Sequence, residues 1–135
     1  MKLIRGVRNN NPGNIKVTAI HWDGERSVEN GFCVFDNPYY GIRAMVKILM
    51  TYKKKHQIET IEEIINRWSA TDQEEYIKFV SKHTGTDPQM YIDLEDPINL
   101  QDIVYAMIWF ENGFEPYTLG MVWRCVEFAI NGEEK

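Results

Sequence analysis

Glu111 is the residue whose type and position could do chemistry, because it follows apolar residues at helical spacing. It takes the next position on the face formed by Leu100, Val104, Met107 and Ile108. Such a face points into the protein, where an ionised carboxylate is unfavourable unless it is paired, or else its pKa rises until it holds a proton. General acid catalysis requires a carboxylic acid that keeps its proton near neutral pH. The spacing therefore makes Glu111 a candidate general acid.

The helix that carries Glu111 is expected to end directly after it. Asn112 and Gly113 follow, and Gly accepts the left-handed conformation of a C-terminal helix cap. A second interpretation stays open at this point. In it, Glu111 only caps its helix and reaches solvent past Gly113, as helix-terminal Glu residues commonly do.

The segment around Glu111 resembles a signature of goose-type lysozymes and soluble lytic transglycosylases. Residues 111–117 read ENGFEPY, similar to the E-S-x-F-N-P-x of those enzymes, in which the Glu is the catalytic acid at a helix end. The chain departs from the signature at Asn112 and Glu115. The resemblance implies cleavage of the peptidoglycan glycan strand, with Glu111 as the acid and Tyr117 among the residues that hold the sugar.

The N-terminal part resembles a family of small phage and prophage proteins that includes virion structural and lysozyme-like members. The matching residues read RNNNPGNIK at 8–16, WDG at 22–24, F-x-x-F at 32–35 and GIRA at 41–44. Cell-wall glucosaminidases and lytic transglycosylases carry a similar N-N-x-F-x-I-K and W-x-G segment after their catalytic Glu, whereas here it precedes Glu111. The resemblance therefore implies a circularly permuted lysozyme-like fold, which chain termini that lie close together would allow.

Amide and aromatic side chains of the N-terminal part are the candidates for binding a sugar. Amides offer hydrogen bonds to hydroxyl and acetamido groups, and an aromatic ring in a turn can stack on a sugar. The resemblance favours this role for Asn10, Asn11, Asn14 and Trp22. The alternative is that the Asn run forms only a turn, because its side chains bond their own backbone, and that Trp22 is a packed aromatic residue.

A second carboxylate usually takes part in glycoside cleavage, as a base or nucleophile across the sugar ring from the acid. Asp23, Glu25 and Glu29 are the candidates, since they lie on or beside the turns of a predicted β segment. We expect Glu29, because the Glu29-Asn30-Gly31 turn would project it from the tip of a hairpin. A lytic transglycosylase needs only one acid, since the substrate's own hydroxyl attacks, so both mechanisms stay open.

No cofactor or metal site is expected from the sequence. His21, His56 and His83 lie far apart, without a partner four residues away or a nearby Cys, so no zinc-binding pattern is present. Cys33 and Cys125 are expected to be free core thiols, with a disulfide as the alternative. A chance pairing of Cys33 with a histidine is left open, although it matches no motif.

Net charge and the lack of long apolar runs limit which partners and which cellular location the sequence predicts for this protein. The net charge of −5 is a poor match for nucleic acid or an anionic lipid surface. No apolar run approaches the ~20 residues of a membrane-spanning helix, and the MKLIRG start lacks the features of a signal peptide. We therefore expect synthesis in the cytoplasm, no membrane or nucleic acid partner, and action at the bacterial cell wall after delivery by a phage particle or a partner pore. The resemblance implies other virion proteins as further partners.

The chain is expected to form a single lysozyme-like domain over residues 1–135, of the α+β class and mainly helical, with a small N-terminal β-hairpin lip. Short β structure is predicted for residues 15–36, including a strand at 15–17. Capping boxes at Thr60 and Thr71 are expected to open two of the helices. Helix start and stop signals predict helices at 37–56, from 60, from 71 to 85, from 97 to 111, and from beyond 116 to 131.

The function expected from these residues is cleavage of the peptidoglycan glycan strand by a muramidase, a lytic transglycosylase or a glucosaminidase. One alternative is a phage structural or wall-binding protein of the same fold without turnover. In that case Glu111 is solvated or tied in a salt bridge, with no cleft beside it. A second alternative is an intracellular adaptor that uses surface aromatic residues and does not bind cell-wall sacculi.

Overall fold

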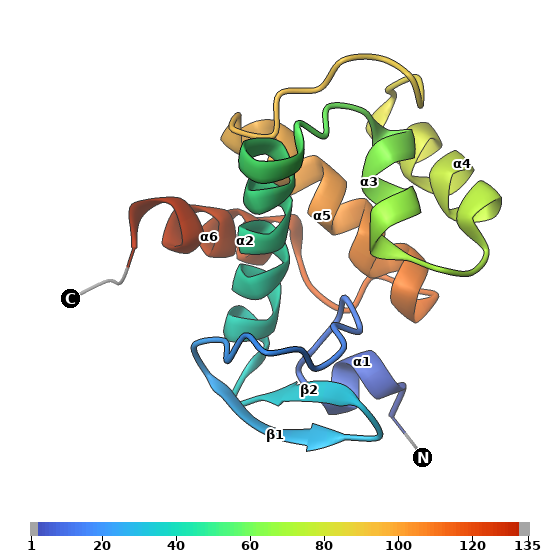
Figure 1. Cartoon of the computed structure of the whole chain (residues 1–135). Helices are drawn as coiled ribbons and strands as arrows, with labels where there is room; N and C mark the ends of the chain where they lie inside the picture. Colours follow the sequence, from blue (N-terminus) through green and yellow to red (C-terminus); the bar gives the residue numbers. More distant parts are fainter. Residues whose placement is uncertain (1–2, 133–135) are drawn as a thin grey trace.

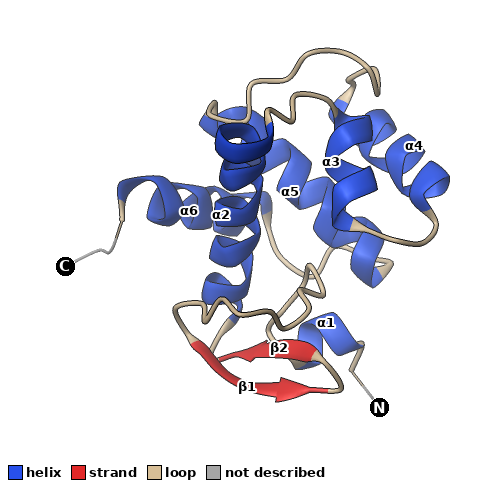
Figure 2. Cartoon of the chain, viewed as in Figure 1, coloured by secondary structure: helices blue, strands red, loops and turns tan. Residues whose placement is uncertain are grey.

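The computed structural model describes residues 3–132 and consists, over that range, of a small hairpin and helices packed around α5 (Figure 1). Helices make up most of this range and the antiparallel strands form its sheet (Figure 2), which confirms the expected class, α+β and mainly helical. None of its helices is long and apolar enough to cross a bilayer. The elements in chain order are α1 (Arg5–Arg8), β1 (Glu25–Glu29), β2 (Phe32–Phe35), α2 (Pro38–His56), α3 (Ile61–Trp68), α4 (Gln73–Thr84), α5 (Pro97–Asn112) and α6 (Leu119–Asn131).

Side-chain caps explain why most helices begin where the sequence predicts. Pro38 and Pro97 stand in the first turn of α2 and α5, where a missing N–H costs no intrahelical hydrogen bond. The residue before each of four helices accepts a hydrogen bond from a backbone N–H group of the first turn: Asn37 for α2, Thr60 for α3, Asp96 for α5 and Thr118 for α6.

The α4 helix begins later than predicted, because Thr71 does not cap it. It starts at Gln73, after Asp72 in the left-handed conformation with φ 52°, and no side chain makes a cap hydrogen bond there. The Thr71 backbone is instead bonded to the Ser69 hydroxyl, which donates to the Thr71 carbonyl oxygen at 2.8 Å. The capping box predicted at Thr71 is therefore wrong. Gly85, with φ 67°, ends the helix as predicted.

The hairpin forms where Asn30 and Gly31 make its turn. Their φ angles are 51° and 86°, the conformation that a two-residue hairpin turn requires and that Asn and Gly accept. β1 pairs antiparallel with β2 from this turn. The predicted turn is confirmed, whereas the strand predicted at residues 15–17 is reduced to an isolated bridge between Lys16 and Phe32.

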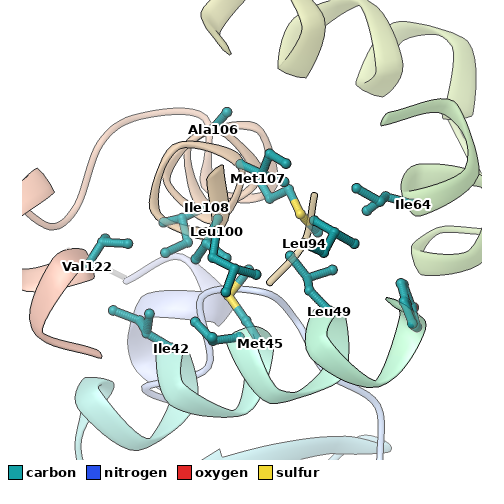
Figure 3. Close-up of a cluster of buried hydrophobic side chains, with 14 of the residues drawn as sticks. Ile42, Met45, Leu49, Ile64, Leu94, Leu100, Ala106, Met107, Ile108 and Val122 are labelled. Atoms are coloured by element: carbon teal, nitrogen blue, oxygen red, sulfur yellow. The ribbon is translucent and has the colours of Figure 1, made fainter. Parts of the chain in front are cut away.

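The core that positions Glu111 lies between α2 and α5 (Figure 3). Side chains of α2 point towards α5, and residues of α3 and α6 close the two sides. Burial of an aliphatic side chain of this size contributes about 1.5–3 kcal/mol. This packing fixes the axis of α5 and so the place of its C-terminal end. The buried residues labelled in this view include Ile42, Met45, Leu49, Ile64, Leu100, Met107, Ile108 and Val122.

The N-terminal segment packs so closely on α2 that two positions require glycine. A Cβ atom on Gly41 would collide with the carbonyl oxygen of Asn10, and one on Gly13 would lie 2.8 Å from Met45 Sδ. The segment also contains the short helix α1, which no start or stop signal in the sequence indicates. Both glycines belong to the motifs that resemble the phage family, so here those motifs have a packing role.

Candidate functional site

Glu111 lies in the last turn of α5 and accepts hydrogen bonds from three side chains. Asn14 Nδ2 donates to Oε1 at 2.9 Å. The Tyr76 hydroxyl and Trp68 Nε1 donate to Oε2 at 2.9 and 3.3 Å. Glu111 is half-buried and, within residues 3–132, forms no ion pair. The alternative of a solvated helix cap does not describe this environment.

Burial raises the pKa of Glu111 above its ordinary value of 4.5. The hydrogen bonds from Asn14, Tyr76 and Trp68 lower the pKa, because donors stabilise the charged form. The positive charge of Arg5 acts in the same direction as these donors. Burial is the largest effect, so the carboxyl keeps its proton to higher pH than a solvated Glu does.

Tyr76 is a firmly held donor. It is 1% exposed, and its ring stacks on Phe110 with 4.1 Å between the centroids. Burial and the neighbouring Glu111 carboxyl raise the pKa of Tyr76 well above its ordinary value of 10.0. The phenol therefore stays protonated, and donates to Glu111, through neutral and moderately alkaline pH.

Asn14 is oriented by Arg5. Its backbone has φ 52°, a left-handed conformation in which Asn is enriched. Arg5 Nε donates to Asn14 Oδ1 at 3.0 Å, which directs the Nδ2 group to Glu111. The Arg5 guanidinium also lies over the Phe32 ring, 3.8 Å from its centroid. Arg5 thus connects β2 to the carboxyl group through one amide.

Asn112 fixes the end of α5 against the N-terminal segment. Its Nδ2 group donates to the Pro12 carbonyl oxygen at 2.9 Å and to the Ile108 carbonyl oxygen at 2.8 Å, and the residue is 4% exposed. A Cβ atom on Gly6 would collide with the Asn112 side chain. The lytic transglycosylase signature has Ser at this position, so the departure at Asn112 has a structural reason in this chain.

Hollows adjoin the Glu111 network. One of about 350 Å³ is lined by Ser69, Thr71, Asp72, Tyr76, Phe110 and Glu111 itself. A longer groove consists of two hollows of about 370 and 530 Å³, and Asn14 and Trp68 line the smaller of them. Ligand sites in proteins usually occupy about 300–1,000 Å³. We call this longer groove the α2–α3 groove; the residues that line both of its hollows are Ile15, Lys16, Thr18, Ile48, Tyr52 and Arg67.

Asn14 and Trp22 are the predicted sugar-binding residues that lie along this groove. Asn14 lines the smaller hollow and contacts Glu111 directly, 97 positions away in the sequence. Trp22 is half-buried and lines the larger hollow. The structure therefore brings the N-terminal segment and the candidate acid to one place.

Asn10, Asn11 and Tyr117 are placed differently. Asn11 is 1% exposed, and its amide bonds the backbone at residues 15 and 33, so it has a structural role here, and its contact with a sugar stays a prediction. Asn10 donates to the Phe35 carbonyl oxygen and so fastens β2 to the segment. Tyr117 is half-buried against the core and lines neither the α2–α3 groove nor the hollow beside the acid.

The carboxylates of the β segment each have a partner of their own. Glu29 forms an ion pair with Arg8 at 2.5 Å, and the hydrogen bond within this pair lowers the pKa of Glu29. Asp23 lies 3.4 Å from Arg43, and Glu25 accepts a hydrogen bond from a backbone N–H of the adjoining turn. None of the three lines the α2–α3 groove or the hollow beside the acid. A role for Glu29 as base or nucleophile stays a prediction.

Trp68, Tyr76 and Arg5 are members of the site that the sequence does not identify. The sequence places the two aromatic residues on the apolar faces of their helices, which hides their role as donors. A signal exists, because the N–H of a buried indole and the O–H of a buried phenol need a partner. The local pattern cannot name that partner, since Glu111 is 43 and 35 residues away.

The other candidate nucleophiles are buried thiols. Cys33 and Cys125 are free and 0% exposed. Burial raises the pKa to about 11 for Cys33 and about 12 for Cys125, which disfavours the reactive thiolate. In the described part of the chain, no three His, Cys, Asp or Glu side chains lie close enough together to hold a metal ion.

Comparison with known proteins shows that the chain is similar in sequence to a bacteriophage protein. No protein-family model matches it. Protein P5 of Pseudoalteromonas phage PM2 is 38% identical to it over 136 residues, which cover 95% of this chain and 83% of the phage protein. Identity at this level, over most of both sequences, indicates common descent. The chain belongs to the same family as phage PM2 protein P5.

Proposed function

We propose that this protein cleaves the glycan strand of bacterial peptidoglycan at the cell wall, with Glu111 as the general acid. The proposal depends on the environment of Glu111, a carboxyl group with a raised pKa and three hydrogen-bond donors that borders a hollow of the surface. The resemblance of residues 111–117 to the lytic transglycosylase signature supports the same reaction.

This environment suits both stages of a proton transfer. Before the reaction, burial favours the protonated carboxyl, which can give its proton to the glycosidic oxygen as the bond to the anomeric carbon breaks. After the transfer, the donors Asn14, Tyr76 and Trp68 stabilise the carboxylate that remains. The glycosidic oxygen, which now carries the transferred proton, leaves as a hydroxyl group of the departing sugar.

We favour a mechanism with a single carboxylic acid. Glu29, the expected second carboxylate, is paired with Arg8, and Asp23 lies beside Arg43. In a lytic transglycosylase, a hydroxyl of the substrate attacks the anomeric carbon and its proton returns to the acid. No carboxylate across the sugar ring is then needed, and the new chain end is an anhydro-sugar.

Digestion of purified sacculi, followed by mass analysis of the soluble products, tests the reaction and the mechanism together. We expect fragments that end in anhydro-muramic acid. Reducing N-acetylmuramic acid ends would indicate a muramidase instead, and reducing N-acetylglucosamine ends a glucosaminidase. A failure to release any soluble fragment, at protein concentrations that saturate the sacculi, would contradict glycan cleavage.

A non-catalytic role in a phage particle is the second candidate, and the relationship to a phage protein favours it. In this role the protein assembles with other virion proteins, and its groove binds the wall without cleaving it. Co-sedimentation with sacculi that releases no fragment would support this role. Cleavage by the wild-type protein would contradict it, and an absence of binding to sacculi would contradict both candidates.

A further inference from the structure

The α2–α3 groove carries positive charge in a protein whose net charge is −5. Lys16 and Arg67 line both of its hollows, and none of the described residues that line it is an Asp or Glu. Within residues 3–132, neither Lys16 nor Arg67 has a carboxylate partner. A groove that concentrates unpaired cations on an acidic protein is complementary to an anionic ligand.

Arg67 is exposed and has two side-chain contacts within this groove. One of its terminal nitrogens lies 3.1 Å from His56 Nε2, which must accept because a guanidinium can only donate. Its guanidinium carbon lies 5.5 Å from the centroid of the Tyr52 ring. Arg67 also directly precedes Trp68, the donor to Glu111, so the same helix carries both the cation and a donor to the acid.

Lys16 comes from the N-terminal segment rather than from α3. It lines both hollows of the groove together with Arg67. A bridge to Phe32 fixes its backbone, and Asn14, two residues earlier, contacts Glu111. Two segments that each contact the acid therefore each contribute a cation to the groove.

We infer that the α2–α3 groove binds a carboxylate carried by the glycan strand, with Arg67 as its main ligand and Lys16 as the second. This inference rests on the proposed function and adds a preference for an acid-bearing strand. N-acetylmuramic acid carries a free carboxylate on its lactyl ether where no peptide is attached. Where a peptide is attached, the lactyl carboxyl is its amide link and the carboxylates are those of the peptide, whereas chitin has a similar backbone without either. A guanidinium matches a carboxylate in a two-bond geometry that neutral sugars do not offer.

Calorimetric binding to the Glu111→Gln protein tests this inference without cleavage of the ligand. The probes are chitotetraose, the alternating N-acetylglucosamine–N-acetylmuramic acid tetrasaccharide, and the same tetrasaccharide with its peptides. We expect an acid-bearing probe to bind about tenfold more tightly than chitotetraose, as for one charge-assisted contact. A gain with the peptide-free tetrasaccharide assigns the lactyl carboxylate, which is an amide in the peptide-bearing probe, and a gain only with the peptide-bearing probe assigns the peptide carboxylates.

Substitutions in the same background identify the ligands of the carboxylate. Arg67→Gln should reduce the preference to less than about threefold, and Lys16→Gln should reduce it in part. Arg26→Gln is the matched control, because Arg26 is exposed and lines neither hollow. Equal affinity for all three probes, binding of none of them, or a preference that persists in Arg67→Gln would overturn the inference.

Digestion of sacculi by the wild-type protein separates this inference from the proposed function. A preference for acid-bearing probes without digestion would leave the carboxylate site standing and remove the enzyme. Digestion by a protein that shows no such preference would leave the enzyme and remove the site.

Discussion

The protonation state of Glu111 depends on two opposing effects, burial and hydrogen bonding. Burial favours the protonated carboxyl, and the three donors favour the carboxylate. An acid of this kind is neither fully solvated nor fixed as an ion by a salt bridge. Changes at its neighbours should therefore move its pKa in directions that the structure specifies.

Tyr76→Phe removes a donor to Glu111 Oε2 and keeps the ring that stacks on Phe110. Loss of one such donor typically slows a reaction by 10²–10³, so we expect digestion of sacculi to be about a hundredfold slower. The alkaline limb of the pH–rate profile should move to higher pH, because this hydrogen bond lowers the pKa of Glu111. Tyr105→Phe, which affects an exposed contact with Glu115, is the control. A rate close to wild type would exclude Tyr76 from the chemistry.

Arg5 should act on Glu111 through both its charge and its hydrogen bond to Asn14. Arg5→Met removes both, so the alkaline limb of the pH–rate profile should move to higher pH by less than about one pH unit, and the rate should fall. Arg5→Lys keeps the charge without the Nε contact, so it should restore the limb better than the rate. Profiles of the two variants that coincide would contradict this division of roles.

The raised pKa of Glu111 should also appear in the stability of the protein. The folded state binds more protons than the unfolded state between the unfolded and folded pKa values, so the free energy of unfolding falls as pH rises through that interval. Gln does not titrate, so position 111 adds no such pH dependence to the stability of the Glu111→Gln variant. The thermal midpoint of the variant, relative to wild type, should therefore be higher at pH 7 than at pH 4. A difference that does not change with pH would show that the pKa is not raised.

At the scale of the elements, the site depends on how the N-terminal segment docks on α2 and α5. The segment carries Asn14, which contacts Glu111, and its Pro12 carbonyl accepts from Asn112 at the end of α5. Gly41 allows the close approach of this segment to α2. Loosening the segment should therefore reduce stability and remove a donor from the acid together.

Gly41→Ala tests this docking, because its Cβ would meet the carbonyl oxygen of Asn10. Overpacking of this kind typically costs about 1–3 kcal/mol, which denaturant unfolding can measure. Gly120→Ala is the control, since only the Thr118 hydroxyl lies near, 3.9 Å away, and Ala favours the helix by about 0.5–1 kcal/mol. If both substitutions have the same effect, close packing at Gly41 does not hold the segment.

Local signals in the sequence predict the elements well and the contacts between them poorly. The caps at Asn37 and Thr60 and the turn at Asn30 are interactions between near neighbours, so the sequence alone indicates them. The cap expected at Thr71 fails because the Ser69 hydroxyl bonds the same backbone. Competition of this kind between two local hydrogen bonds is not visible in a pattern of residue types.

The same limit explains the candidate site. The apolar spacing of residues 100–108 predicts that Glu111 is partly buried, because burial follows from one helix face. The amide run predicts polar ligands, but the sequence does not say that Asn11 turns inward and Asn14 outward to the acid. That choice depends on how the segment docks on other elements, which are distant in the sequence.

At the scale of the whole molecule, the N-terminal part lies at the C-terminal end of α5 (Figure 1). In this chain the segment that resembles N-N-x-F-x-I-K and W-x-G precedes the acid, whereas in the lytic transglycosylases that it resembles the similar segment follows the acid. We propose a circular permutation of a lysozyme-like arrangement as the reason. A solved lysozyme-like structure that superposes on this chain only after its segments are reordered would support the permutation, and superposition in the native order would contradict it.

The measurement that tests the central claim most directly is digestion of sacculi by Glu111→Gln, compared with wild type and with Glu75→Gln. Glu75 is an exposed carboxylate beside Tyr76 and lines neither the groove nor the hollow at Glu111. We predict that Glu111→Gln releases fragments about 10³-fold more slowly than wild type, as loss of a general acid requires, and that Glu75→Gln is unchanged. Digestion by folded Glu111→Gln protein at a rate comparable to wild type would contradict the assignment of Glu111 as the acid.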